Sequence, residues 1–205
     1  MKVIGLTGGI ASGKSAVTNI LKKRYNYVVI DADQLARQAV ELASPGLKKI
    51  VEAFGTDVLT EAGDLNRFKL GEIIANDEQA RKKLNTIVHP EVQRIYNQEI
   101  SRYQNQGIPL IFYDCPLLFE THLQNTVDTT IVVVADKEIR INRIMERDGL
   151  NREQAQKRID MQMPDEEKIA LADMIIENNG SLDDLQVSLD MYLSNQNHEC
   201  EEILK

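Results

Sequence analysis

The 205-residue sequence has few of the residues from which disulfide frameworks and metal clusters are built. Its two cysteines, Cys115 and Cys200, are too few for a disulfide framework or a metal site, and we expect both to be reduced. Its three histidines, at positions 89, 122 and 198, are too far apart in the chain to suggest a metal cluster. The sequence therefore favours neither a disulfide-stapled domain nor a histidine-rich metal centre.

Long apolar runs and an excess of positive charge are also missing. No apolar run approaches transmembrane length, and residues 1–10 are too short and glycine-rich for a secretory signal. The net charge of −8 argues against a general binder of nucleic acid or membrane surfaces, because both need a basic face. We find no internal repeat or low-complexity linker. We therefore expect one cytoplasmic domain of ordinary size, with a sizeable core from its 42% hydrophobic content.

What the sequence does contain is a glycine-rich motif near its start. Residues 8–15 read GGIASGKS and match the phosphate-binding pattern G-x-x-x-x-G-K-[S/T], between an apolar run and a helix-compatible segment. Glycine lets backbone N–H groups approach phosphates, and a helix N-terminus adds partial positive charge. We expect Lys14 to reach the β- and γ-phosphates of a nucleotide and Ser15 to ligate Mg²⁺. The alternative, a chance match to a glycine-rich turn, fits these flanking segments poorly.

Further apolar runs predict a parallel sheet. We expect five strands, at residues 1–7, 27–30, 108–115, 130–135 and 172–177. The fold class that this pattern predicts is α/β, a P-loop nucleoside triphosphate hydrolase fold with a five-stranded parallel sheet flanked by helices. Ligands of such sheets bind at the carboxyl ends of the strands, so polar residues that directly follow a strand are candidates for the site.

Two carboxylates follow the second strand. Asp31 and Asp33 are candidates for a general base or a Mg²⁺ shell, or for capping the next helix, and we expect one to cap and the other to face the site. Arg37 lies four residues after Asp33, on the same helix face. Arg37 would hold a substrate phosphate or, alternatively, form a plain salt bridge.

Polar residues also follow the third and fifth strands. Asp114 stands in the place of a Walker-B carboxylate and is a candidate Mg²⁺ ligand through water. Glu120 would line the acceptor pocket or lie on the surface. Asn178 would contact the nucleotide base, or form a turn before the last helix.

The segment between the second and third strands is longer than an ordinary crossover. Residues 55–106 within it predict an insertion that carries the acceptor pocket. We expect a helix over 77–86 capped by Asn76, and a second helix to about residue 104 with Pro90 in its first turn. His89 would bind a substrate phosphate or hydroxyl, although a capping or packing role is the alternative.

Basic residues are concentrated in 137–158 of this acidic chain. Arg140, Arg143 and Arg147 share one helix face and predict a cationic stripe that closes over polyphosphate. A solvated helix whose arginines pair with neighbouring acidic residues is the alternative. The Asp148-Gly149 turn between two helices is what a mobile lid needs.

Taken together, these motifs resemble one family of kinases. They read, in chain order, GLTGGIASGKS, DADQLAR, HP at 89–90, PLLFE at 116–120, RDGLNREQAQKRIDMQM at 147–163 and ADMIIENNGS at 172–181. In this order they are similar to the dephospho-CoA kinases, over nearly the whole chain to about residue 193. The resemblance implies ATP-dependent phosphorylation of the ribose 3′-hydroxyl of dephospho-CoA, the final step of coenzyme A synthesis. It also implies a nucleotide-kinase-like core, a helical CoA-binding insertion and a lid.

The resemblance also assigns roles to single residues. Asp33 matches the family's proposed base, and Arg143 and Arg147 match lid arginines. The chain departs from the family pattern at Asn66, where the family usually has aspartate, and at Arg140, where it often has glutamine. No family role is carried over to those two positions.

The predicted site is the following. The predicted catalytic residues are Asp33, Lys14, Arg143 and Arg147. Predicted ATP-binding residues are Gly8, Gly9, Ala11, Ser12, Gly13, Lys14, Ser15, Ala16, Arg143, Arg147 and Asn178. Predicted acceptor-binding residues are Asp33, Arg37, Arg67, His89 and Glu120. Predicted Mg²⁺ contacts are Ser15 directly and Asp31 and Asp114 through water.

We predict one P-loop kinase unit with the following parts: core 1–54, 107–136 and 169–193, acceptor insertion 55–106, lid 137–168 and frayed tail 194–205. Its expected partners are ATP and dephospho-CoA, with Mg²⁺ as cofactor, in a monomer without an obligate protein partner. Two alternatives stay open. One is a kinase for another nucleotide or nucleoside, because the core does not encode the acceptor. The other is a P-loop switch, although residues 178–180 do not supply the N-K-x-D motif expected of a GTPase.

Overall fold

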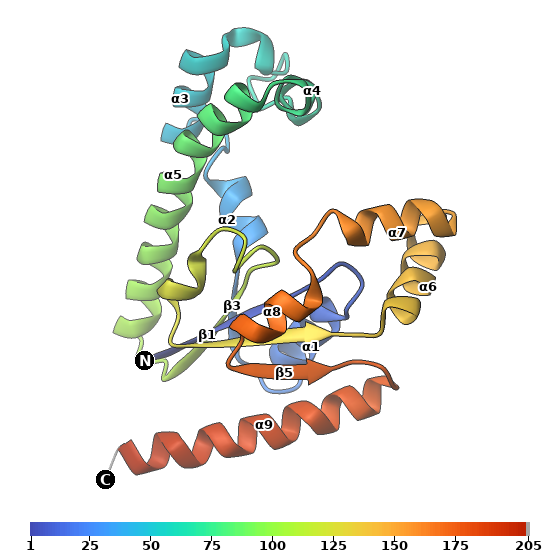
Figure 1. Ribbon diagram of the computed structural model, residues 1–205. Helices are drawn as coiled ribbons and strands as arrows, with labels where there is room; N and C mark the ends of the chain where they lie inside the picture. Colours follow the sequence, from blue (N-terminus) through green and yellow to red (C-terminus); the bar gives the residue numbers. More distant parts are fainter. Residues whose placement is uncertain (204–205) are drawn as a thin grey trace. The chain divides into compact units, whose positions relative to one another are not determined.

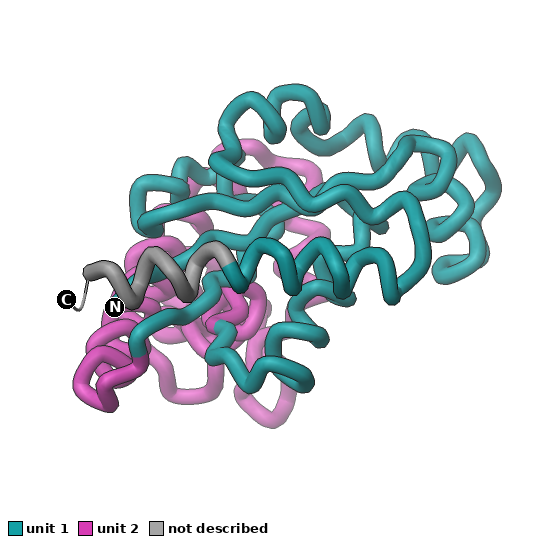
Figure 2. The backbone as a smooth tube through the Cα atoms, turned by 90° about the horizontal axis from the view of Figure 1, so that it is seen from below, with its two compact units in different colours: residues 1–29, 109–205 teal, residues 30–108 magenta. Residues whose placement is uncertain are grey.

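The computed structural model describes the backbone of residues 1–203 and the side chains of residues 1–194. It divides into two compact units, which we call the core unit (residues 1–29 and 109–205) and the helical unit (residues 30–108) (Figure 2). The chain leaves the core unit once and returns to it. The side chains of His198 and Cys200 lie outside the described residues.

The sheet confirms the predicted fold class. Its strands are β1 (Lys2–Gly8), β2 (Val28–Asp31), β3 (Leu110–Asp114), β4 (Thr129–Val134) and β5 (Met174–Glu177), in the order β2-β3-β1-β4-β5 (Figure 1). β1 pairs in parallel with β3 and β4, so that Ile4 lies between Phe112 and Thr129. The central position of β1 places the glycine-rich motif that follows it at the carboxyl edge of the sheet.

The core unit is built on buried apolar residues of these strands. Ile4, Leu6 and Phe112 are buried together with residues of α1 (Lys14–Lys23) and α9 (Leu182–Ile203). Burial of each such side chain contributes about 1.5–3 kcal/mol to the free energy of folding. The central strands β1, β3 and β4 are buried on both faces, so their residues are mostly apolar and do not alternate between apolar and polar. The sequence places the end of the last helix at residue 193, but α9 continues to Ile203 and includes most of the predicted frayed tail. Residues 204 and 205 lie outside the described part.

Three more helices belong to the core unit, namely α6 (Lys137–Asp148), α7 (Arg152–Asp160) and α8 (Asp165–Leu171), together with the short 3₁₀ helix η2 (Leu123–Thr126). Gly149 ends α6 with a left-handed φ of 67°, and Asn151 begins α7 with a capping box that involves Gln154. The turn predicted at Asp148-Gly149 is therefore confirmed. The sequence did not predict α8.

The helical unit consists of α2 (Ala32–Gln38), α3 (Pro45–Phe54), the 3₁₀ helix η1 (Thr56–Val58), α4 (Arg67–Asn76) and α5 (Glu78–Asn105). Helices α2, α3 and α4 each pack on α5. This unit begins at Ile30 rather than at residue 55, because α2 and α3 belong with α5.

The two helices predicted at 77–86 and from Pro90 onward are wrong. α5 is one continuous helix with Pro90 inside it, and its cap is Asp77, whose Oδ1 accepts from the Gln79 and Ala80 N–H groups at 2.8 and 3.1 Å. Asn76, the predicted cap, is the last residue of α4. Proline removes one helical hydrogen bond at a cost of about 3 kcal/mol, and the packing of three helices on α5 offsets that cost.

A buried carboxylate joins α3 to α5. Glu91 accepts from Lys49 Nζ at 2.9 Å and from Arg94 Nε at 3.0 Å. These hydrogen bonds, first that of Lys49 and then that of Arg94, lower the pKa of Glu91, although burial opposes the shift. The ion pair therefore favours the charged form of Glu91.

Across the described helices, none combines the length and the hydropathy needed to cross a bilayer.

Candidate active site

The glycine-rich motif forms a tight loop between β1 and α1. Gly13 adopts a left-handed φ of 100°, and a Cβ there would lie 1.8 Å from Asn178 Nδ2. A Cβ on Gly8 would lie 2.6 Å from the Val133 carbonyl oxygen and 2.7 Å from Ser12 Oγ. Both glycines of the pattern are thus required by the loop itself, one by its turn and the other by its close packing.

Lys14 and Thr18, one turn apart on α1, both contact Asp114 at the end of β3. Lys14 Nζ forms a hydrogen-bonded ion pair with Asp114 Oδ1, and Thr18 Oγ1 donates to Asp114 Oδ2 at 2.6 Å. Asp114 is buried below the loop, in the place expected of a Walker-B carboxylate. Its observed contacts orient Lys14, while the Ser15 hydroxyl is exposed and forms no hydrogen bond within the described part of the chain.

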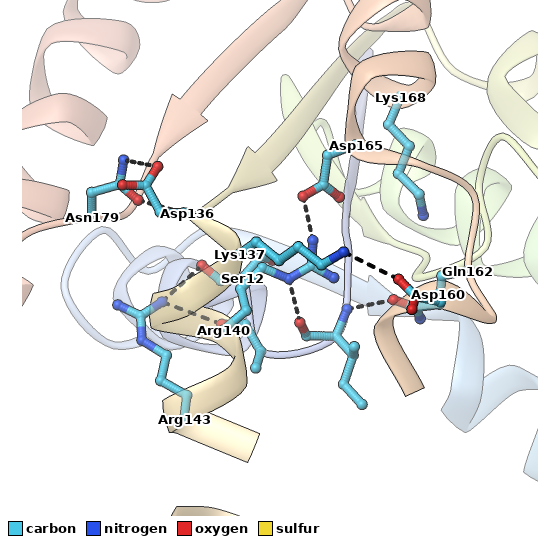
Figure 3. A network of polar contacts seen from close by, with 12 residues as sticks. Ser12, Asp136, Lys137, Arg140, Arg143, Asp160, Gln162, Asp165, Lys168 and Asn179 are labelled. Carbon is cyan, nitrogen blue, oxygen red and sulfur yellow. Dashed lines mark hydrogen bonds and ion pairs between the residues drawn. The ribbon is translucent and has the colours of Figure 1, made fainter. Parts of the chain in front are cut away.

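The tip of the loop is held by residues near the two ends of the predicted lid, 137–168, which we call the base of the lid (Figure 3). Arg140 Nε donates to the Ile10 carbonyl at 2.8 Å, and Arg140 Nη1 forms an ion pair with Asp165. The Ile10 N–H donates to Gln162 Oε1 at 2.6 Å. Arg140 is only 2% exposed, so the prediction that it belongs to a cationic stripe closing over polyphosphate is wrong for this residue. The reason is that the loop and α8 cover it.

Arg143 and Asn178 hold the next carbonyl groups of the loop. Arg143 Nη1 donates to the carbonyls of Ala11 at 3.2 Å and Ser12 at 3.4 Å, and Asn178 Nδ2 donates to that of Ser12 at 2.8 Å. Arg143 Nη2 also donates to the Asn178 carbonyl at 3.0 Å. The loop carbonyls are therefore bound by protein side chains. The predicted ATP contacts of Arg143 and Asn178 stay predictions.

Arg147 has the acidic partner that the sequence offered as an alternative. Its Nε and Nη2 donate to the two carboxylate oxygens of Asp148 at 2.8 and 3.0 Å, and Arg158 Nη1 donates to the same carboxylate at 2.6 Å. The hydrogen bonds with Arg147 lower the pKa of Asp148, and Asp148 in turn raises the pKa of Arg147. Arg147 is exposed. If it closes over phosphate as predicted, its ion pair with the Asp148 carboxylate would be replaced by one with the phosphate.

One of the predicted residues of the helical unit, Asp31, is a helix cap. Asp31 caps α2, with its Oδ1 accepting from the backbone N–H groups of Asp33 at 2.8 Å and Gln34 at 3.2 Å. Asp33, Arg37, Arg67 and His89 are exposed, and in the described chain none of these four side chains forms a hydrogen bond or ion pair. The prediction that one of Asp31 and Asp33 caps the helix is thus confirmed, and the site role of the other stays a prediction. The structure does not join the four exposed side chains to one another.

Glu120 has a structural partner that the sequence did not reveal. Lys168 of α8 is fully buried, and its Nζ donates to Glu120 Oε1 at 2.5 Å. Glu120 Oε2 is buried and has no hydrogen-bond partner among the described residues. Glu120 is therefore not a simple surface residue, and its acceptor role stays a prediction.

Several residues of the site were missed from the sequence. Thr18 had a signal, because it lies four residues after Lys14 on the same helix face. Gln162 lies within the lid motif at 147–163, but nothing in the sequence indicated its contact with the loop. Asp165 and Lys168 had no signal, because their partners Arg140 and Glu120 lie in distant segments of the chain.

Comparisons with known proteins give one consistent result. A family model described as dephospho-CoA kinase matches residues 2–184. A dephospho-CoA kinase of Listeria innocua is 46% identical over 185 residues, which cover 90% of this chain and 92% of the relative. The solved structure of a dephospho-CoA kinase from Campylobacter jejuni is similar with a TM-score of 0.74 and 30% identity, covering 97% of this chain and all of the other. The crystal structure of TT1252 from Thermus thermophilus has a TM-score of 0.79 and 38% identity, with coverage of 95% and 97%.

Proposed function

The chain belongs to the dephospho-CoA kinase family, and from this premise we propose that its site transfers the γ-phosphoryl group of ATP to the ribose 3′-hydroxyl of dephospho-CoA. The family reaction is the ATP-dependent phosphorylation that completes coenzyme A synthesis, so the chain is a transferase of the P-loop kinase class. The observation that carries the proposal is the complete phosphate loop in a chain that matches the family from residue 2 to residue 184.

We assign the donor half of the reaction to the core unit. Because side chains bind the carbonyls of Ile10, Ala11 and Ser12, the protein's own contacts orient the loop peptides. Backbone N–H groups of such a loop and of the first turn of α1 bind phosphate oxygens. Lys14 then leaves Asp114 for the β- and γ-phosphates, or bridges the two.

Mg²⁺ fits the oxygen donors present at the loop. Within the described residues, no three His, Cys, Asp or Glu side chains gather as a metal-binding cluster. A Mg²⁺ that is bound mainly by nucleotide phosphates and water needs only one or two protein oxygens. We propose that the exposed Ser15 hydroxyl is one of them and that Asp114 acts through water. The ion supplies electrostatic stabilisation of the charge on the transferring group.

We assign the base to Asp33. Its carboxylate is exposed in the first turn of α2, while Asp31 takes the capping role that would otherwise occupy it. The attacking hydroxyl loses its proton as it bonds to phosphorus, and an unpaired carboxylate is suited to accept that proton. Arg37, Arg67 and His89 are the proposed acceptor contacts of the same unit, since all three are exposed and unpaired in the part of the chain that the structure describes. Glu120 remains a further proposed contact.

The lid arginines are proposed to act on closure. Arg147 would exchange Asp148 for the transferring phosphoryl group, and Arg143 would add charge from its place beside the loop. Guanidinium groups match phosphate oxygens in pairs, and a closed lid limits hydrolysis by water. We further propose that the chain works as a monomer in the cytoplasm, because both substrates are small molecules that need no second subunit.

A coupled ADP-release assay tests the proposal. Wild-type protein is offered dephospho-CoA, AMP, CMP and pantothenate, and we expect rapid turnover with dephospho-CoA alone. Asp33→Asn should lower kcat by roughly two to four decades with a nearly normal KM for ATP, the usual range for loss of a general base. Asp57→Asn, which changes another exposed aspartate of the helical unit, is the matched control and should leave kcat unchanged. Faster turnover with another acceptor would refute the substrate assignment, and normal turnover of Asp33→Asn would refute the base.

A further inference from the structure

One residue of the phosphate loop, Ile10, is bound by side chains from both ends of the lid. The Ile10 carbonyl accepts from Arg140, which lies in the helix that enters the lid. The Ile10 N–H donates to Gln162, which lies in the segment that leaves it. Figure 3 labels Arg140 and Gln162, which come from different elements. The peptide groups on the two sides of Ile10 are thus each fixed by a different part of the lid.

Side-chain packing supports the same connection. Ile10 and Ala11 pack against a small hydrophobic cluster of the lid, formed by Ile141, Ile144 and Ala155. The members of that cluster are fully buried. Ile10 and Ala11, two of the four loop residues that the phosphate-binding pattern leaves free, therefore pack on the lid's own core. A movement of the lid base would shift the loop by way of these contacts as well as the hydrogen bonds.

Gly9 shows how closely Arg140 approaches the loop. A Cβ on Gly9 would lie 2.5 Å from Arg140 Nη2 and 2.8 Å from Cζ. The phosphate-binding pattern requires glycine at positions 8 and 13 but not at position 9. The guanidinium has little freedom to move aside, because it is buried and paired with Asp165. The structure therefore explains Gly9 by the packing of Arg140.

We propose that Arg140 and Gln162 are positioning residues that hold the phosphate loop in the shape that binds ATP, so that the affinity of the loop for ATP depends on the base of the lid. Arg140 is buried, so it acts through the Ile10 peptide and not by touching nucleotide. The hydrogen bonds of loop N–H groups to phosphate weaken steeply when their angle changes, so a tilt of this peptide lowers ATP affinity. The inference rests on the proposed function only in taking ATP as the ligand of the loop.

Three single variants and one control test this role. Gln162→Met removes the acceptor of the Ile10 N–H and keeps the length of the side chain. Arg140→Met removes the charged donor, and Gly9→Ala pushes the guanidinium away without changing it. Arg152→Met removes an exposed lid arginine whose ion-pair partner, Glu138, is exposed as well, and is the matched control.

Each variant is titrated calorimetrically with a non-hydrolysable ATP analogue, and its KM values for ATP and dephospho-CoA are measured. We expect Kd for the analogue to rise about three- to tenfold in Gln162→Met and roughly ten- to a hundredfold in Arg140→Met, since hydrogen bonds to charged groups contribute more. KM for ATP should rise in parallel while KM for dephospho-CoA stays constant. Arg152→Met should match wild type in all three quantities.

A double-variant cycle identifies the mechanism. Gly9→Ala and Arg140→Met act on the same contact, so their combination should weaken analogue binding no more than the larger single effect. Additive effects would overturn the link between Gly9 and Arg140. Unchanged analogue affinity in Gln162→Met and Arg140→Met, with only a lower melting temperature, would show a purely structural role and overturn the proposal. Gln162 is only partly buried, so its variant remains informative if the Arg140 variant fails to fold.

The outcome is separable from that of the proposed function. If wild-type protein does not phosphorylate dephospho-CoA, the substrate assignment fails, whereas the analogue titrations need no acceptor and still decide the role of Arg140 and Gln162.

Discussion

Replacing Lys168 by methionine should destabilise the core unit strongly, although the side chain is far from the phosphate loop in sequence. Lys168 has a fully buried side chain, and its ammonium donates to Glu120 at 2.5 Å. Removing one partner of a buried ion pair costs about 3–5 kcal/mol, because the other charge is left without compensation. The Glu120 side chain is 20% exposed and can turn partly toward water, so we expect Lys168→Met to cost about 3 kcal/mol, the lower end of that range.

Replacing the other partner of the ion pair, Glu120, should cost more stability. Glu120→Leu leaves an ammonium with no exposed surface, and we expect it to cost about 5 kcal/mol. The double variant Lys168→Met with Glu120→Leu replaces the pair by apolar groups of similar size, so it should recover most of the loss. This order of the three variants follows from the unequal burial of the two charges.

Urea unfolding at neutral pH, followed by circular dichroism, measures these free energies. Lys157→Met is the matched control, because Lys157 and its partner Glu153 have side chains 72% and 78% exposed and should contribute well under 1 kcal/mol. A loss below about 1 kcal/mol for Lys168→Met would refute the reasoning. So would a larger loss for Lys168→Met than for Glu120→Leu, because burial would then not decide the cost.

Three further predictions follow from contacts described above. The lowered pKa of Glu91 means that the stability contributed by its ion pair is complete above about pH 5 and is lost as the pH falls from about 4.3 toward the lowered value. The difference in unfolding free energy between wild type and Glu91→Gln should therefore shrink over that pH window in urea titrations. An increase in this difference on acidification would contradict the prediction. Thr18→Val removes a hydrogen bond to a buried carboxylate and should lower the unfolding free energy by about 1.5–3 kcal/mol in the same assay; no change would show that the bond is not needed. Gly13→Ala should weaken binding of the ATP analogue by roughly tenfold or more, from its left-handed φ and its clash with Asn178. Gly107→Ala, where φ is positive but space is open, should leave that affinity unchanged.

The fold was largely predictable because its signals are local. Each strand is a short apolar run, and the glycine-rich motif lies between the first run and a helix. The continuous helix α5 was not predictable, because Pro90 is a helix-breaking signal that only the packing of neighbouring helices overrides. The unit boundary at Ile30 was missed for the same reason, since it depends on which helices pack on α5.

The site was predictable only where a residue's role depends on its own segment. Gly13, at the turn of the loop, and the capping residue Asp31 belong to that group. The helix face shared by Arg140 and Arg147 suggested one common role, but Arg140 is bound by the distant phosphate loop while Arg147 pairs with its neighbour Asp148. Spacing along a helix places side chains on a face, and it does not reveal what covers that face.

The central position of β1 has a consequence for the order in which the chain folds. β1 is synthesised before the other four strands, but Lys2 pairs with Leu110 and Ile4 with Thr129, so both neighbouring strands come much later. Pairings this distant are slow, because the entropy of closing a long loop must be overcome before any contact forms. All residues of the helical unit, by contrast, have left the ribosome before β3 does. The phosphate loop therefore takes its final shape late in synthesis, and ATP can act as a folding ligand only for a chain that already extends beyond Val134.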